Sequence, residues 1–150
     1  MWGAISWYGK SQLHFIQGNI NANRYMNEIL GPVLLPFYRQ HPRHAHFLQD
    51  NAPPHRAHAT QDWLNARNIA QLDRPWPTKS PDLNPIENLW GIMGTNIRNR
   101  LNPPTNVQEM EAALRQEWAA IPLALIRRLI LSMRRRCRAV VQAAGGPTKY

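Results

Sequence analysis

The chain has 150 residues and a net charge of +9, from 18 Lys and Arg against 9 Asp and Glu. This length fits one domain, and such a chain can bury about 70% of its unfolded surface. Such a basic chain favours polyanionic partners, and nucleic acid is the first of these. Anionic membrane surfaces rank lower, because the sequence has no long apolar run and no lipidation motif. Cys137 is the only cysteine, which excludes an intrachain disulfide and favours a reducing compartment. The start of the chain also lacks the pattern of a signal peptide, so a cytosolic or nuclear location is expected.

Residues 1–20 predict a β-hairpin. Two apolar stretches, residues 4–8 and 13–17, flank a turn at residues 9–11 that contains a glycine. Because the chain begins almost inside a strand, we expect an element upstream of this sequence to be missing.

A long helix is predicted next. Asn21 or Asn23 can cap its start, and apolar residues recur on one face until about Gln40. Gly31 and Pro32 are expected to bend or split this helix, because proline removes a backbone donor and crowds the preceding turn.

The rest of the chain alternates strands and helices and then becomes helical. Short strands are predicted at residues 45–49 and 69–72, with a helix over residues 56–67 between them. A proline-rich stretch, residues 73–85, predicts an ordered and extended connection. Further helices are predicted over residues 85–101, 105–119 and 122–144. This order predicts an α/β layer fold with a mixed sheet, part of which is the antiparallel hairpin.

The segment QDNAPPH, residues 49–55, places Asp50 where a predicted buried strand meets a loop. Ligands gather at the carboxyl ends of strands in open α/β sheets, so Asp50 is a candidate metal ligand with Asn51 and His55 close by. The alternative is an Asx-turn, in which the carboxylate only satisfies local backbone donors.

The segment SPDLNPIENLW, residues 80–90, places Glu87 in the first turn of a predicted helix. Asn84 at the N-cap, Pro85 at the first helical position and Glu87 two residues later form a capping box. Glu87 could therefore do no more than close the helix start, although a capped turn also fixes its direction. Two carboxylates about 4 Å apart repel by roughly 4 kcal/mol at an effective dielectric near 20, so such a pair favours a bound cation, and oxygen ligands suit Mg²⁺ or Mn²⁺.

Clustered histidines make zinc a second candidate metal. His41, His44 and His46 cluster, and so do His55 and His58. Zinc would need further ligands at orderly spacing, and the single cysteine is remote. We therefore expect loop or surface histidines, with His55 near the carboxylate site.

The last predicted helix carries two stripes when it is drawn at 100° per residue. Apolar side chains from Ile126 to Val141 form one stripe, a core or partner surface. The second stripe holds Arg127, Arg128, Arg134, Arg135 and Arg138, while Arg136 lies on a third side. The arginine stripe is a candidate contact for DNA phosphates, and a solvated face is the alternative. The run RRRCR also resembles a weak nuclear import signal.

Together these segments resemble the Tc/mariner-type transposases, whose catalytic domain has the RNase H-like fold with a DDE or DDD carboxylate triad. Four stretches carry the resemblance: WGAIS at residues 2–6, QDNAP at 49–53, SPDLNPIENLW at 80–90 and GGPTKY at 145–150. The resemblance implies an α/β, RNase H-like mixed sheet flanked by helices, with its first strand missing. Residues 1–101 would be a partial catalytic domain, and residues 102–150 a helical extension of the same domain.

By this resemblance Asp50 corresponds to the second catalytic carboxylate and Glu87 to the third, and both would hold Mg²⁺ or Mn²⁺. Asn51, His55 and Asn84 would support them. Between the two acids lie 36 residues, slightly more than is usual in the family. No residue here matches the family's first aspartate or its helix-turn-helix region, so we expect a catalytic-domain fragment that is inactive or nearly so alone.

The resemblance also implies partners and a location. The family cleaves DNA with divalent metal at transposon ends and then joins the freed 3′-OH to target DNA, so we expect DNA as partner and a nuclear location. A homodimer is an open alternative, and neither a membrane nor a small-molecule substrate is expected. Two other interpretations remain: a non-catalytic DNA-binding or assembly module that keeps the basic face, and a gene-model fragment that does not fold alone.

Overall fold

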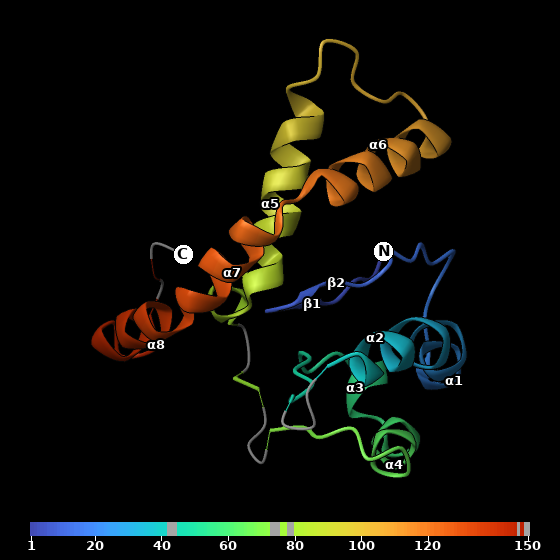
Figure 1. Ribbon diagram of the computed structural model, residues 1–150, viewed down its shortest axis with the longest axis vertical. Coiled ribbons are helices and arrows are strands. Elements are labelled where there is room, and N and C mark those ends of the chain that lie inside the picture. The colour runs from blue at the N-terminus through green and yellow to red at the C-terminus, as the bar shows by residue number, and fades with distance from the viewer. Residues whose placement is uncertain (42–44, 73–75, 78–79, 147, 149–150) are drawn as a thin grey trace. The chain divides into compact units, whose positions relative to one another are not determined.

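A computed structural model describes residues 1–41, 45–72, 76–77, 80–146 and 148 (Figure 1). Two compact units make up the chain: Met1–Ala4 with Lys10–Lys79, and Ile5–Gly9 with Ser80–Tyr150. His44 and part of the segment GGPTKY lie outside the described residues. In the described part of the chain, no helix is long and apolar enough to cross a lipid bilayer.

The predicted N-terminal hairpin is confirmed, but it is shorter than expected. Strands β1 (Ile5–Ser6) and β2 (Gly9–Lys10) form a two-stranded sheet. Farther from the turn, Trp2 and His14 pair as an isolated antiparallel bridge. The hairpin therefore keeps its antiparallel pairing over a longer stretch than its two short strands.

The predicted position of the hairpin turn is wrong. Trp7 and Tyr8 make the turn, two residues before the expected one. The cause is Ser6, whose Oγ accepts the backbone N–H groups of Tyr8 and Gly9 at 3.1 and 3.2 Å. A serine hydroxyl that satisfies these donors closes a tight turn without a glycine in its centre.

One unbroken helical segment follows the hairpin, as α1 (Ala22–Arg24), η1 (Tyr25–Leu34) and α2 (Leu35–Arg39). Asn21 caps it as predicted, because its Oδ1 accepts the Arg24 backbone N–H at 2.9 Å. The predicted helix from about residue 21 to residue 40 is thus confirmed.

Of the two expected outcomes at Gly31 and Pro32, a bend or a split, the split does not occur, because the helix widens there. η1 is a π-helix, and the Leu35 N–H at its end donates to the Leu30 carbonyl, five residues back. A wider turn accommodates the proline ring that would crowd an α-helical turn. Gly31 is close-packed in this stretch, since an added Cβ would lie 3.3 Å from the Met26 carbonyl oxygen.

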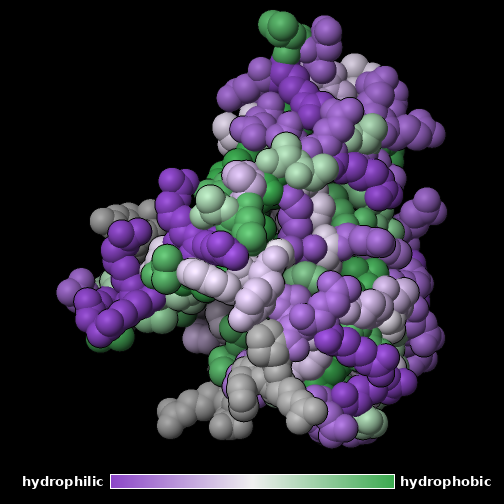
Figure 2. All heavy atoms as spheres, viewed as in Figure 1, coloured by the Kyte–Doolittle hydropathy of each residue, from purple (hydrophilic) through white to green (hydrophobic). Residues whose placement is uncertain are grey.

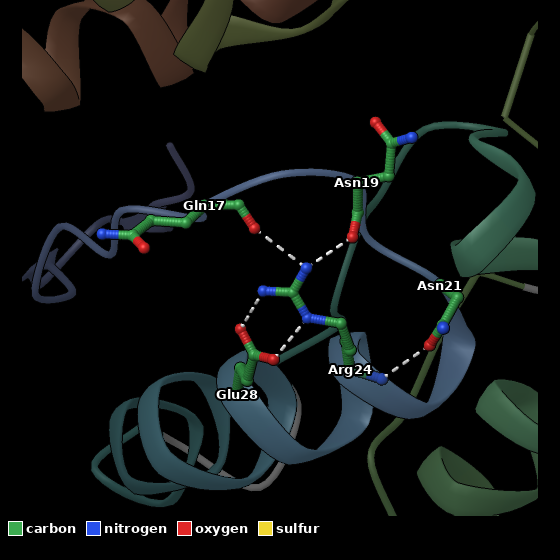
Figure 3. A network of polar contacts seen from close by, with 5 residues as sticks. All are labelled: Gln17, Asn19, Asn21, Arg24 and Glu28. Carbon is green, nitrogen blue, oxygen red and sulfur yellow. Dashed lines mark hydrogen bonds and ion pairs between the residues drawn. The ribbon is translucent and has the colours of Figure 1, made fainter.

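Arg24 fastens the preceding loop to this helix (Figure 3). Its Nε and Nη2 donate to the Glu28 carboxylate at 2.6 and 2.9 Å, and its Nη1 donates to the carbonyls of Gln17 and Asn19. The hydrogen bonds from Arg24 lower the pKa of Glu28. One arginine therefore fixes both the loop and the first helical turn.

The two strands predicted in the middle of the chain shrink to a single parallel bridge between Phe47 and Gln71. The Phe47 N–H donates to the Ala70 carbonyl at 2.7 Å. Tyr38 limits further pairing, because its hydroxyl donates to the Ala45 carbonyl at 2.7 Å and accepts the Ala70 N–H at 3.0 Å. A side chain thus takes backbone groups that a longer ladder would use, so the predicted strand lengths are wrong.

The helix predicted after Asp50 forms as two helices, α3 (Pro53–Arg56) and α4 (His58–Asn65). Ala57 separates them with extended backbone angles. Thr60, fully buried, joins the two by donating from Oγ1 to the Pro54 carbonyl at 2.7 Å. The apolar core of this first unit comprises Tyr25, Ile29, Leu30, Leu34, Leu64 and Ile69.

The second unit is helical apart from the hairpin residues that belong to it. Its elements are η2 (Pro81–Leu83), α5 (Pro85–Arg98), α6 (Val107–Ala120), α7 (Leu123–Leu131) and α8 (Met133–Gln142). α6 packs on α5, with the rings of Trp90 and Trp118 stacked 5.2 Å apart. The core contains Leu89, Met93, Ile97, Ala113, Trp118, Ile121 and Ile126.

The single helix predicted over residues 122–144 is interrupted at Ser132. The Ser132 hydroxyl donates back to the Leu129 carbonyl at 2.6 Å and accepts from Arg136 Nε at 2.7 Å. Such back-bonding competes with the helical ladder and ends α7 before α8 begins. The interruption changes the expected stripes: Val141 and Cys137 are exposed, whereas Arg136 is buried.

Candidate functional site

Asp50 lies at the rim of a cavity of about 310 Å³ in the first unit. The stretch from Phe47 to Asn51 lines one part of this cavity, and Gln61, Gln71 and Trp76 line others. Asn51 ties the rim to the proline-rich stretch, because its Nδ2 donates to the Trp76 carbonyl at 2.6 Å. The side chain of Asp50 is 56% exposed, so the carboxylate is accessible to a ligand from solvent.

The carboxylate of Asp50 is held through one of its oxygens. Oδ1 accepts the Ala52 backbone N–H at 3.0 Å, which is the Asx-turn of the alternative interpretation. The same oxygen lies 2.6 Å from His55 Nδ1. Among the residues that the structure describes, Oδ2 makes no hydrogen bond. The Asx-turn and a ligand role are therefore compatible, since one oxygen orients the group and the other stays available.

His55 is placed by a buried tyrosine. Its ring lies 4.4 Å from that of Tyr25, centroid to centroid, and its side chain is only 17% exposed. The approach of Nδ1 to Asp50 is short but poorly aligned, so this buried nitrogen has no well-aligned hydrogen bond within the described ranges. Most buried polar atoms in proteins are hydrogen-bonded, so this nitrogen beside Asp50 is an exception among the described residues.

Tyr25 also contacts the residue that precedes Asp50. It is 1% exposed, and its hydroxyl donates to Gln49 Oε1 at 2.9 Å. Burial, and to a lesser extent the nearby charge of Asp50, raises the pKa of Tyr25. The hydroxyl therefore stays neutral and acts as a donor to the residue that precedes Asp50.

Glu87 is exposed and lies in the first turn of α5, in the second unit. Asn84 is the N-cap as predicted, and its Oδ1 accepts the Ile86 N–H at a long 3.4 Å. The Glu87 N–H donates to the Asn84 carbonyl at 3.1 Å, and the Asn84 N–H donates to the Pro81 carbonyl at 2.9 Å. The direction of Glu87 is thus set by a tight turn that leads directly into a helix.

The predicted site residues fall into two groups. Asp50, Asn51 and His55 gather at the cavity of the first unit, whereas Asn84 and Glu87 belong to the second. No set of three or more His, Cys, Asp or Glu side chains in the described ranges forms a metal-binding group. The pairing of Asp50 with Glu87 around one cation stays a prediction.

The predicted arginine stripe is exposed over most of its length. Arg128, Arg134, Arg135 and Arg138 are exposed on α7 and α8, and Figure 2 shows mostly hydrophilic residues over α8. Arg127 differs, because its Nε donates to the Trp7 carbonyl at 3.0 Å and its guanidinium lies 5.2 Å from the Trp7 ring. Arg127 therefore joins α7 to the hairpin turn.

Arg136 is a structural residue that the sequence analysis did not single out. Only 3% of it is exposed, and it binds Ser132 and the backbone of Asp82. One indication of this role was present in the sequence: on the helical wheel, Arg136 lies apart from the stripe formed by the other arginines.

Comparisons with known proteins agree on one family. The sequence profile described as DDE superfamily endonuclease matches residues 1–110. The Tc3 transposase of Caenorhabditis elegans is 32% identical over 151 residues, and the Tcb1 transposase of Caenorhabditis briggsae is 36% identical over 151 residues. These alignments cover 100% of this chain but 45% and 54% of the relatives, so the chain spans about half the length of the curated relatives it matches.

Solved structures give the same result for the fold. The catalytic domain of the Mos1 mariner transposase has a TM-score of 0.73 and 26% identity, covering 88% of this chain and 66% of that one. The Mos1 catalytic domain solved with raltegravir and Mg has a TM-score of 0.72 at 26% identity. The same domain was also solved with raltegravir and Mn.

Proposed function

Because this chain belongs to the DDE superfamily endonuclease family and has the RNase H-like fold of its structural neighbours, we propose that it is the catalytic part of a Tc1/mariner-type transposase that cuts and joins DNA. The observation that carries the proposal is the family match over residues 1–110, which includes both acidic turns. A chain of net charge +9 is also suited to a DNA partner.

Asp50 and Glu87 are proposed as ligands of Mg²⁺ or Mn²⁺. Structures of the related Mos1 domain were solved with each of these metals. The donor chemistry fits, because both groups are exposed carboxylates, and Asp50 keeps Oδ2 without a hydrogen bond among the described residues. When bound, such a metal stabilises the negative charge that develops at a phosphodiester under attack.

The neighbouring residues hold these carboxylates in place. The Ala52 N–H and the His55 ring orient Asp50 through Oδ1, and Asn51 fixes the cavity rim on which Asp50 lies. Asn84 does the same for Glu87 by capping α5, whose first turn carries Glu87. Preorganised ligands lower the entropy cost of binding a metal and a phosphate group.

The exposed arginines of α7 and α8 are proposed to contact DNA phosphates, whether of transposon ends or of target DNA. These exposed arginines, whose side chains are accessible to a ligand in solvent, are Arg128, Arg134, Arg135 and Arg138. Each phosphate that they neutralise adds about −0.9 to the slope of log affinity against log salt. A nuclear location and a homodimer remain part of the same proposal.

A non-catalytic DNA-binding or assembly module is the second candidate, favoured by one observation. Arg128, Arg134, Arg135 and Arg138 lie on α7 and α8, elements that carry neither Asp50 nor Glu87, so the basic residues can be retained when either acid is lost. If only binding is retained, Asp50→Asn and Glu87→Gln leave DNA affinity unchanged or raised, with no change in the response to metal.

Manganese binding tests the proposed function without relying on turnover. We expect Asp50→Asn and Glu87→Gln each to weaken Mn²⁺ binding by about tenfold or more, measured by electron paramagnetic resonance titration. Asp62→Asn on α4 and Glu111→Gln on α6 make the same changes of charge elsewhere in each unit and serve as controls. Equal Mn²⁺ affinity in all four variants would overturn the ligand assignment.

Cleavage by this chain alone is predicted to be weak or absent. Only two of the three carboxylates that the family uses are matched in this sequence. Metal-dependent nicking of supercoiled plasmid that disappears in Asp50→Ala would contradict this prediction, while it would support the metal site.

A further inference from the structure

Arg136 connects α8 to the turn that precedes Glu87. From its buried position, Nη1 donates to the Asp82 carbonyl at 2.9 Å and Nε donates to Ser132 Oγ at 2.7 Å. Asp82 is the central residue of η2, which ends immediately before Asn84 and α5. A side chain 54 residues later in the sequence therefore fixes the backbone of the SPDLNP segment.

A second contact reinforces the same turn. Thr148, beyond the end of α8, donates from Oγ1 to Asp82 Oδ2 at 2.9 Å. Leu83 is buried beside these polar contacts. Asp82 is therefore held through its backbone by Arg136, through its side chain by Thr148, and through its neighbour by packing.

The chemistry of arginine explains why such a contact is specific. A guanidinium loses much solvation when it is buried, so it is stable there only when its N–H groups reach acceptors. Its planar group offers several donors in fixed directions, which allows one side chain to bind a hydroxyl on its own helix and a carbonyl on another segment. A lysine at this position has no such fork.

We infer that Arg136 is a positioning residue, which fixes η2 and thereby the first turn of α5 from which Glu87 projects. Two backbone bonds in this turn depend on the position of η2: Asn84 N–H to Pro81 O at 2.9 Å, and Glu87 N–H to Asn84 O at 3.1 Å. The use of Glu87 as a metal ligand rests on the proposed function, whereas the positioning of its turn does not.

Hydrogen exchange of backbone amides tests the positioning role directly. Arg136→Met is expected to speed exchange in residues 80–90 by about tenfold, because a hydrogen bond from a charged group is lost. Arg136→Lys keeps the charge and a donor nitrogen, without the fork of the guanidinium, and is expected to restore part of the protection. Thr148→Val, which removes only the hydroxyl contact, is expected to speed exchange by about threefold.

Two controls separate positioning from general stability. Arg115→Met makes the same substitution at an exposed arginine of α6, and it should leave exchange in residues 80–90 unchanged. Ile126→Ala removes a buried side chain of α7 and should speed exchange across the second unit as a whole. If Arg136→Met raised exchange evenly across the unit, as Ile126→Ala does, or left residues 80–90 unchanged, the inference would be wrong.

A milder variant keeps the test decisive if Arg136→Met does not fold. Ser132→Ala removes the acceptor of Nε and retains the guanidinium. It is expected to speed exchange in residues 80–90 by about threefold, and unchanged exchange there would again contradict the inference.

Manganese titration of the same variants distinguishes failure of this inference from failure of the proposed function. Arg136→Met is expected to weaken Mn²⁺ binding in the same direction as Glu87→Gln, with recovery in Arg136→Lys. Unchanged Mn²⁺ affinity in Glu87→Gln would overturn the ligand role of Glu87, and the exchange data would still decide whether Arg136 positions its turn.

Discussion

The turns that carry Asp50 and Glu87 are stabilised in different ways. Asp50 is held by groups within five residues, Ala52 and His55, and the His55 ring packs at a tilt against the core residue Tyr25. Glu87 is held by a helix start whose preceding turn is bound by Arg136 and Thr148, 54 and 66 residues away from Asp82. The first arrangement depends on the local chain and on the core beneath it, and the second depends on polar contacts with the end of the chain.

The largest expected loss of stability comes from substitutions in the apolar cores of the two units, and these test the difference between the two turns. Leu64→Ala in the first unit and Leu89→Ala in the second each remove a fully buried side chain and are expected to cost about 2–5 kcal/mol of unfolding free energy. Leu64→Ala should increase amide exchange around Asp50 much more than around Glu87, and Leu89→Ala should do the reverse. Urea denaturation with hydrogen exchange measures both, and equal loosening of both turns by either variant would contradict the difference.

Tyr38→Phe tests how far hydrogen bonds of side chains replace a sheet near Asp50. The variant leaves the Ala45 carbonyl and the Ala70 N–H without their partner, so we expect a loss of about 2 kcal/mol. Tyr25→Phe removes the hydroxyl's bonds with the side chains of Gln49 and Trp2, neither of which involves a backbone group, and should cost about 1 kcal/mol. Chemical denaturation of both variants measures the order, and a larger loss in Tyr25→Phe would show that the Phe47 bridge does not need Tyr38.

Helix caps of the second unit allow a finer test of the Glu87 turn. Asn106→Ala removes a cap bond of 2.8 Å to the Glu109 N–H and should cost about 1 kcal/mol. Asn84→Ala removes a longer bond of 3.4 Å and should cost about 0.5 kcal/mol, because η2 and Arg136 hold the turn independently. Thermal unfolding of the two variants compares them, and a greater loss in Asn84→Ala would mean that the cap holds Glu87 more than η2 does.

The smallest expected effect is a dependence on pH in the second unit. Hydrogen bonds from Arg100 and Asn96 lower the pKa of Glu117 below its ordinary value of 4.5. Since the folded pKa is the lower one, this contact stabilises the protein above about pH 4.5 and is lost as the pH falls through the folded pKa. The loss should stay below about 1 kcal/mol, because the contact lies near the surface. Glu117→Gln should reduce the difference in urea midpoint between neutral and acidic pH, and an unchanged difference would exclude this contribution.

The sequence predicted features that depend on nearby residues. Asn21 and Asn84 cap the helices they were expected to cap, and the hairpin and the main helices form. Cap side chains and apolar periodicity act within one or two turns, so the relevant residues lie side by side in the sequence. For the same reason, Asn51 and His55 lie beside Asp50 as expected.

Features that depend on a particular side-chain contact were missed. Ser6 moves the hairpin turn, Tyr38 shortens the strands, and Ser132 interrupts the last helix, each through hydrogen bonds of one hydroxyl. Backbone propensity does not reveal which hydroxyl will compete with the ladder. The burial of Arg136 was missed for the same reason, since it depends on two particular acceptors, Ser132 Oγ and the Asp82 carbonyl.

The pairing of the two carboxylates could be predicted only from the family resemblance. Asp50 and Glu87 have 36 residues between them in the chain and belong to different units, so no local pattern connects them. Composition and charge indicate a polyanionic partner but do not select its chemistry. The family match is the basis for proposing that the acidic turns serve in DNA cleavage.

Because Tyr25–Leu34 forms a π-helix, the fold depends on the number of residues in this segment. Deleting one residue there would change both the length of the helix and the phase about its axis of the residues that follow the deletion. Tyr25 would keep its place beside His55 and Gln49, whereas Leu34 and Tyr38 would turn away from the positions they now occupy. Descendants of this sequence should therefore tolerate substitutions between these positions more readily than any change in their number.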